Sequence, residues 1–293
     1  MAVYERGFRR YSGALTSPRW RFLVLPRFAY QEVFRSRLLT AFFALACIAP
    51  LVFAVLIYLH HNFSAIAFLD VDLDDLVPID ERFFFIFLNV QSGFGFVLTA
   101  FVGPALVSPD LAHNALPLYL ARPFSRAEYV LGKLTVLVGL LSLITWVPGL
   151  LLFLLQAFLE GAGWGFEHAR IAAGLFVGAW TWILGNSLLA LALSAWVRWR
   201  PVAGALYFGA TMVSAGFANA VAAVFDTRWG HLVNLDLLYK TVWSDLFGSP
   251  QGFLNEQLMG SVPVWSAWAA LATFALICLA MLARKVRAYE VVR

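Results

Sequence analysis

The sequence predicts an all-α integral membrane protein with six transmembrane helices. Apolar residues make up 61% of the 293 positions, charged residues only 13%, and the mean hydropathy is +0.78. Soluble domains carry about 45–50% apolar and about 25% charged residues, so this chain has too few charged groups to cover a soluble surface. Six uninterrupted apolar stretches are each long enough to cross about 30 Å of hydrocarbon. They lack the alternating polarity of membrane β-strands, so we expect helices.

Residues 1–37 are expected to lie on the cytoplasmic side and to carry an amphipathic helix. Pro26 is expected to set the start of this helix, because proline is tolerated in a first helical turn. Residues 27–37 then offer apolar side chains interleaved with arginines. This pattern is typical of a helix that lies in the membrane interface.

The six spans are expected to form one domain, residues 38–283, which a basic cytoplasmic tail follows at 284–293. No span contains Asp, Glu, Lys, Arg or His. Pro104 and Pro148 adjoin glycines inside their spans and are expected to kink them. The predicted spans are 38–59, 83–107, 134–155, 171–197, 202–225 and 262–283.

The distribution of basic residues predicts the orientation of the chain. Of its 21 Lys and Arg residues, 17 fall in the N-terminal segment, the second and fourth connections and the tail. The positive-inside rule places these segments, and hence both termini, in the cytoplasm. In a membrane protein a net charge of +4 favours acidic lipid, rather than nucleic acid, as its partner.

The absence of charge inside the spans limits the function. Proton pumps and ion-coupled transporters usually need ionisable groups within the membrane. Here the polar groups are amides, which either line a path for a polar substrate or hydrogen-bond between helices. The amides concerned are Asn89, Gln91, Asn186 and Asn219.

Motifs for catalysis and for ATP binding are missing. A phosphate-binding loop requires Gly-Lys followed by Ser or Thr, but the only Gly-Lys pair, Gly132-Lys133, is followed by leucine. Serine-hydrolase and zinc-protease patterns are absent too, so no catalytic residue is assigned and we expect no enzyme.

No metal site is expected. Acidic residues of the first outer connection fall at positions 1, 3, 5 and 12 of a calcium-loop template, but Asp75 stands where the template needs glycine for its turn. An acidic outer loop is the favoured interpretation, and calcium binding there stays open.

The connection after the second span carries the most local signals. Ser108 is expected to cap a short helix in which Pro109 takes the first position and Asp110 complements the positive helix end. A later proline limits that helix to a few turns. Ser125 and Glu128 form the S-x-x-E capping box, which predicts a second helix that runs into the third span. An ordinary capped connection between two spans would show the same signals.

The same connection resembles a family motif. The matching residues are Asp110, Leu116 to Leu120, Arg122-Pro123, Ser125-Arg126, Glu128-Tyr129 and Gly132-Lys133. Their order and spacing are similar to those in the permease subunits of bacterial ABC-2-type ABC transporters, although Asn114-Ala115-Leu116 stands where many members have Gly-Thr-Leu. The layout of the whole chain, with a basic N-terminal segment, six spans and a long outer connection before the last span, is also similar.

The resemblance implies an export permease of the bacterial inner membrane without a motor of its own. A separate cytoplasmic ATPase dimer would bind ATP and Mg²⁺, and a second permease copy, in a homodimer, would help to enclose the path. The helix after the second span would be a coupling helix in a groove of the ATPase, with Asp110 meeting a basic residue there, and the N-terminal helix would touch the ATPase as well. The coupling residues so implied are Asp110, Leu111, Asn114, Leu116, Arg122, Arg126 and Glu128.

The outer connection 226–261 is too long for a plain loop. Its apolar residues repeat at helical spacing, which predicts an interfacial or re-entrant helix on the outer side. These residues are Leu235, Leu238, Val242, Trp243 and Leu246. In the family, short helices at this place cap the exit of the path, and a surface helix without that role is the alternative.

Two further classes of function stay open. A self-contained secondary transporter or channel would also have several spans, but this chain lacks buried charge and a pair of discontinuous helices. A membrane-embedded enzyme would need a catalytic cluster near an interface, and the sequence offers none.

Overall fold

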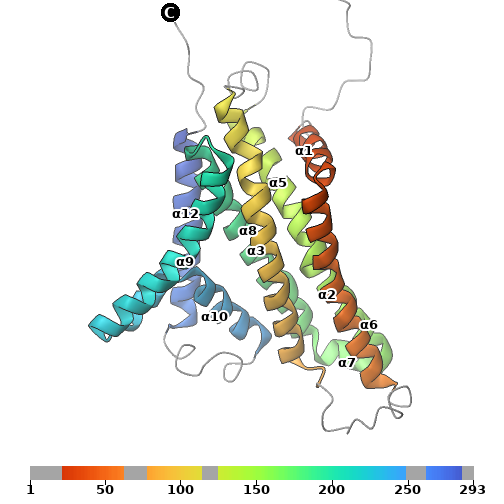
Figure 1. Cartoon of the computed structure of the whole chain (residues 1–293). Coiled ribbons are helices and arrows are strands. Elements are labelled where there is room, and N and C mark those ends of the chain that lie inside the picture. Colours follow the sequence, from red (N-terminus) through yellow and green to blue (C-terminus); the bar gives the residue numbers. More distant parts are fainter. Residues whose placement is uncertain (1–21, 63–77, 114–124, 249–261, 286–293) are drawn as a thin grey trace, which may run out of the picture.

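Figure 1 shows the computed structural model of the chain, which describes residues 22–62, 78–113, 125–248 and 262–285. This part of the chain is helical and contains no strand. The described residues thus confirm an all-α protein. Six of its helical segments are long enough and apolar enough to cross a membrane. These segments are Arg37–His61, Glu81–Ala112, Arg126–Glu160, Ala169–Trp196, Arg200–Phe225 and Val264–Lys285.

The first two helices, α1 (Val24–Arg35) and α2 (Arg37–His61), are separated by one extended residue, Ser36. The helix expected at the N-terminal side of the first span is therefore present, but its predicted start at Pro26 was wrong by two residues. The amides of a first helical turn have no partner within the helix, so proline fits at several positions of that turn. Ser36 then caps α2, because its Oγ accepts a hydrogen bond from the amide of Leu39 at 3.5 Å.

Helix α3 (Glu81–Ala112) is longer than the predicted second span, which ended at 107. It continues through Pro104 and Pro109, so the prediction that Ser108 caps a new helix was wrong. Ser108 is buried inside α3, and its Oγ donates a hydrogen bond to the Ser194 carbonyl of α8 at 3.2 Å. Packing against a neighbouring helix therefore outweighs the local capping signals at this turn, as happens often where tertiary contacts oppose propensity.

The third span consists of two helices, α5 (Arg126–Ile144) and α6 (Trp146–Glu160), which meet at Thr145. Thr145 has φ −108° and ψ −94°, outside the helical region. Pro148 lies in the first turn of α6, and its ring would clash with the carbonyl of Ile144 in a continuous helix. The distortion predicted at Pro148 is thereby confirmed. Gly161, with φ 115°, then turns the chain into the short helix α7 (Ala162–Glu167).

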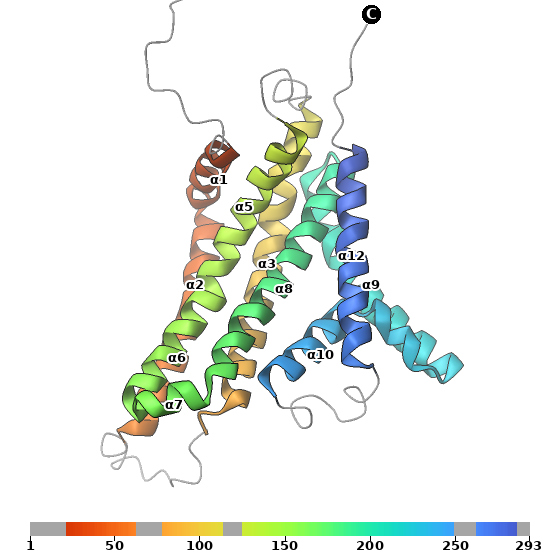
Figure 2. The same ribbon diagram turned by 180° about the vertical axis from the view of Figure 1, so that it is seen from behind.

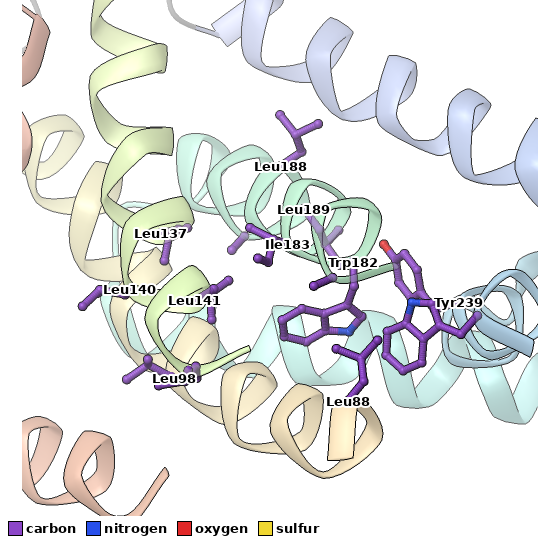
Figure 3. Close-up of a cluster of buried hydrophobic side chains, with 14 of the residues drawn as sticks. Leu88, Leu98, Leu137, Leu140, Leu141, Trp182, Ile183, Leu188, Leu189 and Tyr239 are labelled. Atoms are coloured by element: carbon purple, nitrogen blue, oxygen red, sulfur yellow. The ribbon is translucent and has the colours of Figure 1, made fainter. Parts of the chain in front are cut away.

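Helix α8 (Ala169–Trp196) forms the centre of the bundle. It contacts α3, α5, α6, α9, α10 and α12, and 72% of its most apolar stretch is buried. Figure 3 shows side chains of α3, α5, α8 and α10 meeting around it. The labelled core residues are Leu88, Leu98, Leu137, Leu140, Leu141, Trp182, Ile183, Leu188, Leu189 and Tyr239.

The last described elements are α9 (Arg200–Phe225), the 3-10 helix η5 (Arg228–Val233), α10 (Leu235–Phe247) and α12 (Val264–Lys285). Figures 1 and 2 show α9 running outward from the bundle, while α10 returns inward beside α8 and α12. Only 6% of the most apolar stretch of α9 is buried. The beginning of α1 and the end of α12 lie at the same end of the molecule, as six crossings require.

Candidate functional site

The carboxylate of Asp110 joins the end of α3 to α5. Its Oδ2 accepts a hydrogen bond from the Tyr129 hydroxyl at 2.7 Å and lies 2.9 Å from the Nζ of Lys133. Tyr129 and Lys133 stand four residues apart and so share one face of α5. The Lys133 ammonium also lies 5.6 Å from the centroid of the Tyr129 ring. Three side chains thus hold two spans together where the connection between them begins and ends.

This ion pair is largely withdrawn from solvent. The side chains of Asp110 and Lys133 are 14% and 11% exposed, and Tyr129 is buried. Removing one partner of such a pair strongly destabilises the folded protein, because the other charge is left without compensation. A basic group of a partner would therefore meet a carboxylate that already carries an internal ion pair. The coupling role of Asp110 stays a prediction.

The capping box at the start of α5 is confirmed. The amide of Ser125 donates to Glu128 Oε2 at 2.6 Å, and the amide of Glu128 donates to Ser125 Oγ at 3.2 Å. Arg126, the first residue of the helix, is exposed. The start of α5 is therefore fixed in position by its own sequence.

The remaining coupling candidates fall into two groups. Leu111 lies in the last turn of α3 and is partly buried against the hydrophobic core. Asn114, Leu116 and Arg122 lie outside the described residues, so the predicted coupling helix cannot be placed from them. What the structure places is the pair of helix ends, at Ala112 and Arg126, from which that segment leaves and to which it returns.

Helix α1 packs directly on α5 beside this cluster. The Tyr30 hydroxyl donates to the carbonyls of Thr135 and Val136 at 3.1 and 3.3 Å. Burial raises the pKa of this Tyr30 hydroxyl above its ordinary value. Gly139 of α5 makes room for it, because a Cβ there would overlap the Tyr30 hydroxyl. A second link, between Arg200 Nη2 and Glu32 Oε1 at 3.4 Å, ties α1 to α9.

Sequence reasoning matched Tyr129 and Lys133 to a motif but missed their contact with Asp110. Their spacing of four residues on a helix was the available signal. It also missed Glu32 and Arg200 as partners, because 168 positions separate them and no local pattern connects them.

The four membrane amides have different surroundings within this chain. Gln91 Nε2 donates to the Ala46 carbonyl of α2 at 3.2 Å, and Asn186 Oδ1 accepts from the Tyr207 hydroxyl of α9 at 2.7 Å. These two amides hydrogen-bond between helices, which is one of the two interpretations considered. Asn89 is partly buried, and Asn219 is exposed on α9.

The helix predicted in the connection 226–261 is present as α10 (Leu235–Phe247), and it packs against α8 rather than lying free on the surface. Its aromatic side chains at Tyr239, Trp243 and Phe247 face three glycines of α8, namely Gly185, Gly178 and Gly174 in that order. Trp243 Nε1 donates to the Gly178 carbonyl at 3.0 Å. Because glycine has no side chain, these positions of α8 let the two helices approach closely. This close approach explains why α10 is mostly buried.

The C-terminal end of α10 is held by Arg170, at the start of α8. The guanidinium donates to the carbonyls of Leu246 at 3.0 Å and of Asp245 at 2.5 Å. Carbonyls at a helix C-terminus have no partner within the helix and carry partial negative charge, so a cation there is favourable.

At the same end of the molecule as α7, His61 bridges α2 and α6. Its Nε2 lies 2.8 Å from Glu160 Oε2, and its Nδ1 is 3.0 Å from the Ile57 carbonyl. Within the described part of the chain no three His, Cys, Asp or Glu side chains are grouped as a metal site would require.

A comparison with protein-family models finds no matching family, and a comparison with curated proteins finds no matching relative.

Proposed function

We propose that the chain is the permease subunit of a bacterial ABC-2-type exporter. In this proposal two copies form the transport path in the inner membrane, with both termini in the cytoplasm. A separate cytoplasmic ATPase dimer binds ATP and Mg²⁺ and supplies the free energy, while this chain hydrolyses no ATP. The motif between Asp110 and Lys133 and the order of the segments support this assignment.

The observation that carries the proposal is the attachment of the connection between α3 and α5. On one side α3 ends at Ala112, two residues after Asp110, and on the other α5 begins behind the capping box at Ser125. Lys133 bridges the two helices through Asp110. A force on this connection would act on two spans together. A coupling element needs such a firm attachment, whereas a plain loop does not.

Helix α8 extends this attachment through the bundle. At one end it accepts the Ser108 hydrogen bond from α3, and further along it holds α10 through Gly178 and Trp243. A single helix therefore contacts both α3, two residues before Asp110, and the helix proposed to cap the exit. Coupling between the two ends would appear in transport and in ATP hydrolysis measured together.

The experiment first examines whether a gene for an ATP-binding-cassette ATPase lies beside the gene for this chain, and then co-expresses the two proteins. We expect the ATPase to co-purify with the full chain, and ATP-dependent transport in liposomes to require both subunits. A Lys→Ala variant in the phosphate-binding loop of the ATPase is the control, and it should assemble without transporting. If the purified chain alone moves solutes down a gradient, and no ATPase binds it, the self-contained transporter or channel replaces this proposal.

A further inference from the structure

A groove of about 750 Å³ opens between α1, α2, α3, α5 and α9, next to the Asp110–Lys133 pair. Pockets that bind small molecules typically measure about 300–1,000 Å³. Its walls are apolar for most of their length, with side chains such as Leu25, Phe28 and Leu106. The groove thus has the size of a ligand site and the lining expected for an amphiphile.

Four charged side chains also line the groove, and they cancel in two pairs. Asp110 and Lys133 form the inner pair. Glu32 and Arg200 form the outer pair, with side chains 68% and 49% exposed. Each pair contains one carboxylate and one cation, so the polar part of the groove is neutral as a whole and offers both signs of charge.

The outer rim of the groove is apolar and exposed. Phe28, Leu38 and Phe101 are 64%, 64% and 53% exposed. Exposed aromatic and aliphatic side chains beside α2 and α3, both membrane-crossing helices, are suited to contact with lipid tails. The groove therefore joins a hydrocarbon-facing rim to a charged interior, which is the arrangement of polarity in a phospholipid.

We propose that this groove binds one phospholipid that carries a primary-amine headgroup. The lipid phosphate lies against Arg200 and Lys133, the ammonium donates to the Glu32 carboxylate, and the acyl chains leave past Phe28 and Phe101. Arg200 presents five N–H donors in a fork that matches phosphate oxygens, and the structure shows one of its nitrogens, Nη2, at Glu32. The assignment of this lipid to the cytoplasmic leaflet rests on the orientation in the proposed function. The binding itself needs no ATPase.

The paired charges favour this headgroup over two others. An anionic headgroup without an amine would satisfy the cations but would also lie against two carboxylates, which repel it. A quaternary ammonium has no N–H group and so could not hydrogen-bond to Glu32, whereas a primary ammonium has three. The expected order of affinity is therefore phosphatidylethanolamine first, with phosphatidylcholine and phosphatidylglycerol behind it.

The test uses the purified full chain, delipidated in detergent and mixed with equal amounts of these three phospholipids. Native mass spectrometry then counts the lipid retained by each molecule. We expect one retained phosphatidylethanolamine at about tenfold preference over phosphatidylcholine, because a hydrogen bond to a charged group is lost with the quaternary amine. Glu32→Gln should remove that preference, and Arg200→Gln should weaken retention of all three lipids about tenfold.

Arg198→Gln is the matched control, because Arg198 is exposed, lies two residues from Arg200 and does not line the groove. Its lipid retention should equal that of the wild type. Equal retention of the three phospholipids by the wild type would overturn the proposal, and so would an equal loss in Arg198→Gln and Arg200→Gln.

A second measurement identifies what covers the groove in the membrane. A photoreactive benzoylphenylalanine in place of Phe28 should form an adduct with phospholipid when membranes are irradiated. A polypeptide adduct in its place would overturn lipid binding and would assign the groove to a protein partner. Both measurements use the chain without an ATPase, so their failure is distinct from a failure of the proposed function.

Discussion

Lys133 Nζ lies 2.9 Å from Asp110 Oδ2, and this ion pair connects the last turn of α3 with α5. The Tyr129 hydroxyl donates to the same carboxylate oxygen at 2.7 Å. The charge that the motif places after the second span is thus compensated inside the chain. Its first role is to set the position of two helices relative to each other.

Asp110→Asn should lower the stability of the folded chain. The change leaves the Lys133 ammonium largely buried without a counter-charge, and we expect a loss of about 1–3 kcal/mol. Thermal unfolding in detergent micelles measures it. Asp236→Asn is the control, because Asp236 pairs with Lys240 at 2.8 Å but is 71% exposed. That change should stay within about 0.5 kcal/mol. Similar losses in both variants would contradict the structural role of Asp110.

The double variant Asp110→Asn with Lys133→Met separates this structural role from a contact with the ATPase. Removing both charges leaves neither one buried alone, so stability should recover by about 1 kcal/mol or more relative to Asp110→Asn. Co-purification of the ATPase is measured on the same preparations. If the stable double variant still fails to bind the ATPase, Asp110 or Lys133 contacts it directly. If binding returns with stability, the pair acts only by positioning α3 and α5.

The capping box offers a milder change at the other end of the connection. Glu128→Ala removes the side chain that accepts from the Ser125 amide, and we expect a loss of about 0.5–2 kcal/mol. Glu128→Gln is the matched control, since glutamine serves in the same box. The unfolding midpoint should fall for the first variant and remain near the wild type for the second. A midpoint of Glu128→Ala equal to that of the wild type would show that the Glu128 side chain contributes nothing measurable to this cap.

The sequence predicted the helices with the strongest periodic or apolar signals. Continuous runs without charge gave the six spans, the S-x-x-E spacing gave the start of α5, and apolar spacing in the outer connection gave α10. Each of these signals is local, because a span must satisfy its own backbone hydrogen bonds in lipid. Local reasoning is therefore most reliable for the existence of such elements.

Contacts between distant segments were not predictable in the same way. Ser108 shows every local sign of a helix cap, yet it lies inside α3 because it packs against Ser194. Glu32 and Arg200 become partners only after α1 and α9 are placed by the rest of the fold. The aromatic side chains that fill the space beside the glycines of α8 became known only from the arrangement of α10.

The orientation of the chain can be tested by cysteine labelling. Arg126 lies at the end proposed to be cytoplasmic, and Glu167, in α7, lies toward the opposite end (Figure 1). In intact cells, a membrane-impermeant maleimide should label Glu167→Cys, and Arg126→Cys should react only after permeabilisation. The native thiols give little background, because Cys278 is buried and Cys47 is partly buried. The reverse labelling pattern would contradict the positive-inside assignment.

The docking of α10 on α8 predicts that replacing a glycine by alanine changes stability differently in α8 and in α9. A Cβ at Gly185 would overlap the Tyr239 hydroxyl, whereas a Cβ at Gly209 or Gly216 of α9 would meet nothing within 4 Å. Alanine is normally favoured over glycine inside a helix by about 1 kcal/mol. The α9 variants should therefore be neutral or slightly more stable. Gly185→Ala should lose about 1–3 kcal/mol, because α10 must move or Tyr239 must leave its rotamer.

The rescue variant distinguishes this overlap from a general intolerance of α8 to substitution. Tyr239→Phe removes the hydroxyl that a Cβ at Gly185 would meet, so the double variant Gly185→Ala with Tyr239→Phe should recover part of the lost stability. Thermal unfolding of the four proteins completes a double-mutant cycle. If α10 also caps the exit of a transport path, Gly185→Ala should change transport in liposomes while ATPase co-purification stays at the wild-type level. A Gly185→Ala variant as stable as Gly209→Ala would mean that α10 does not lie against α8 in the membrane.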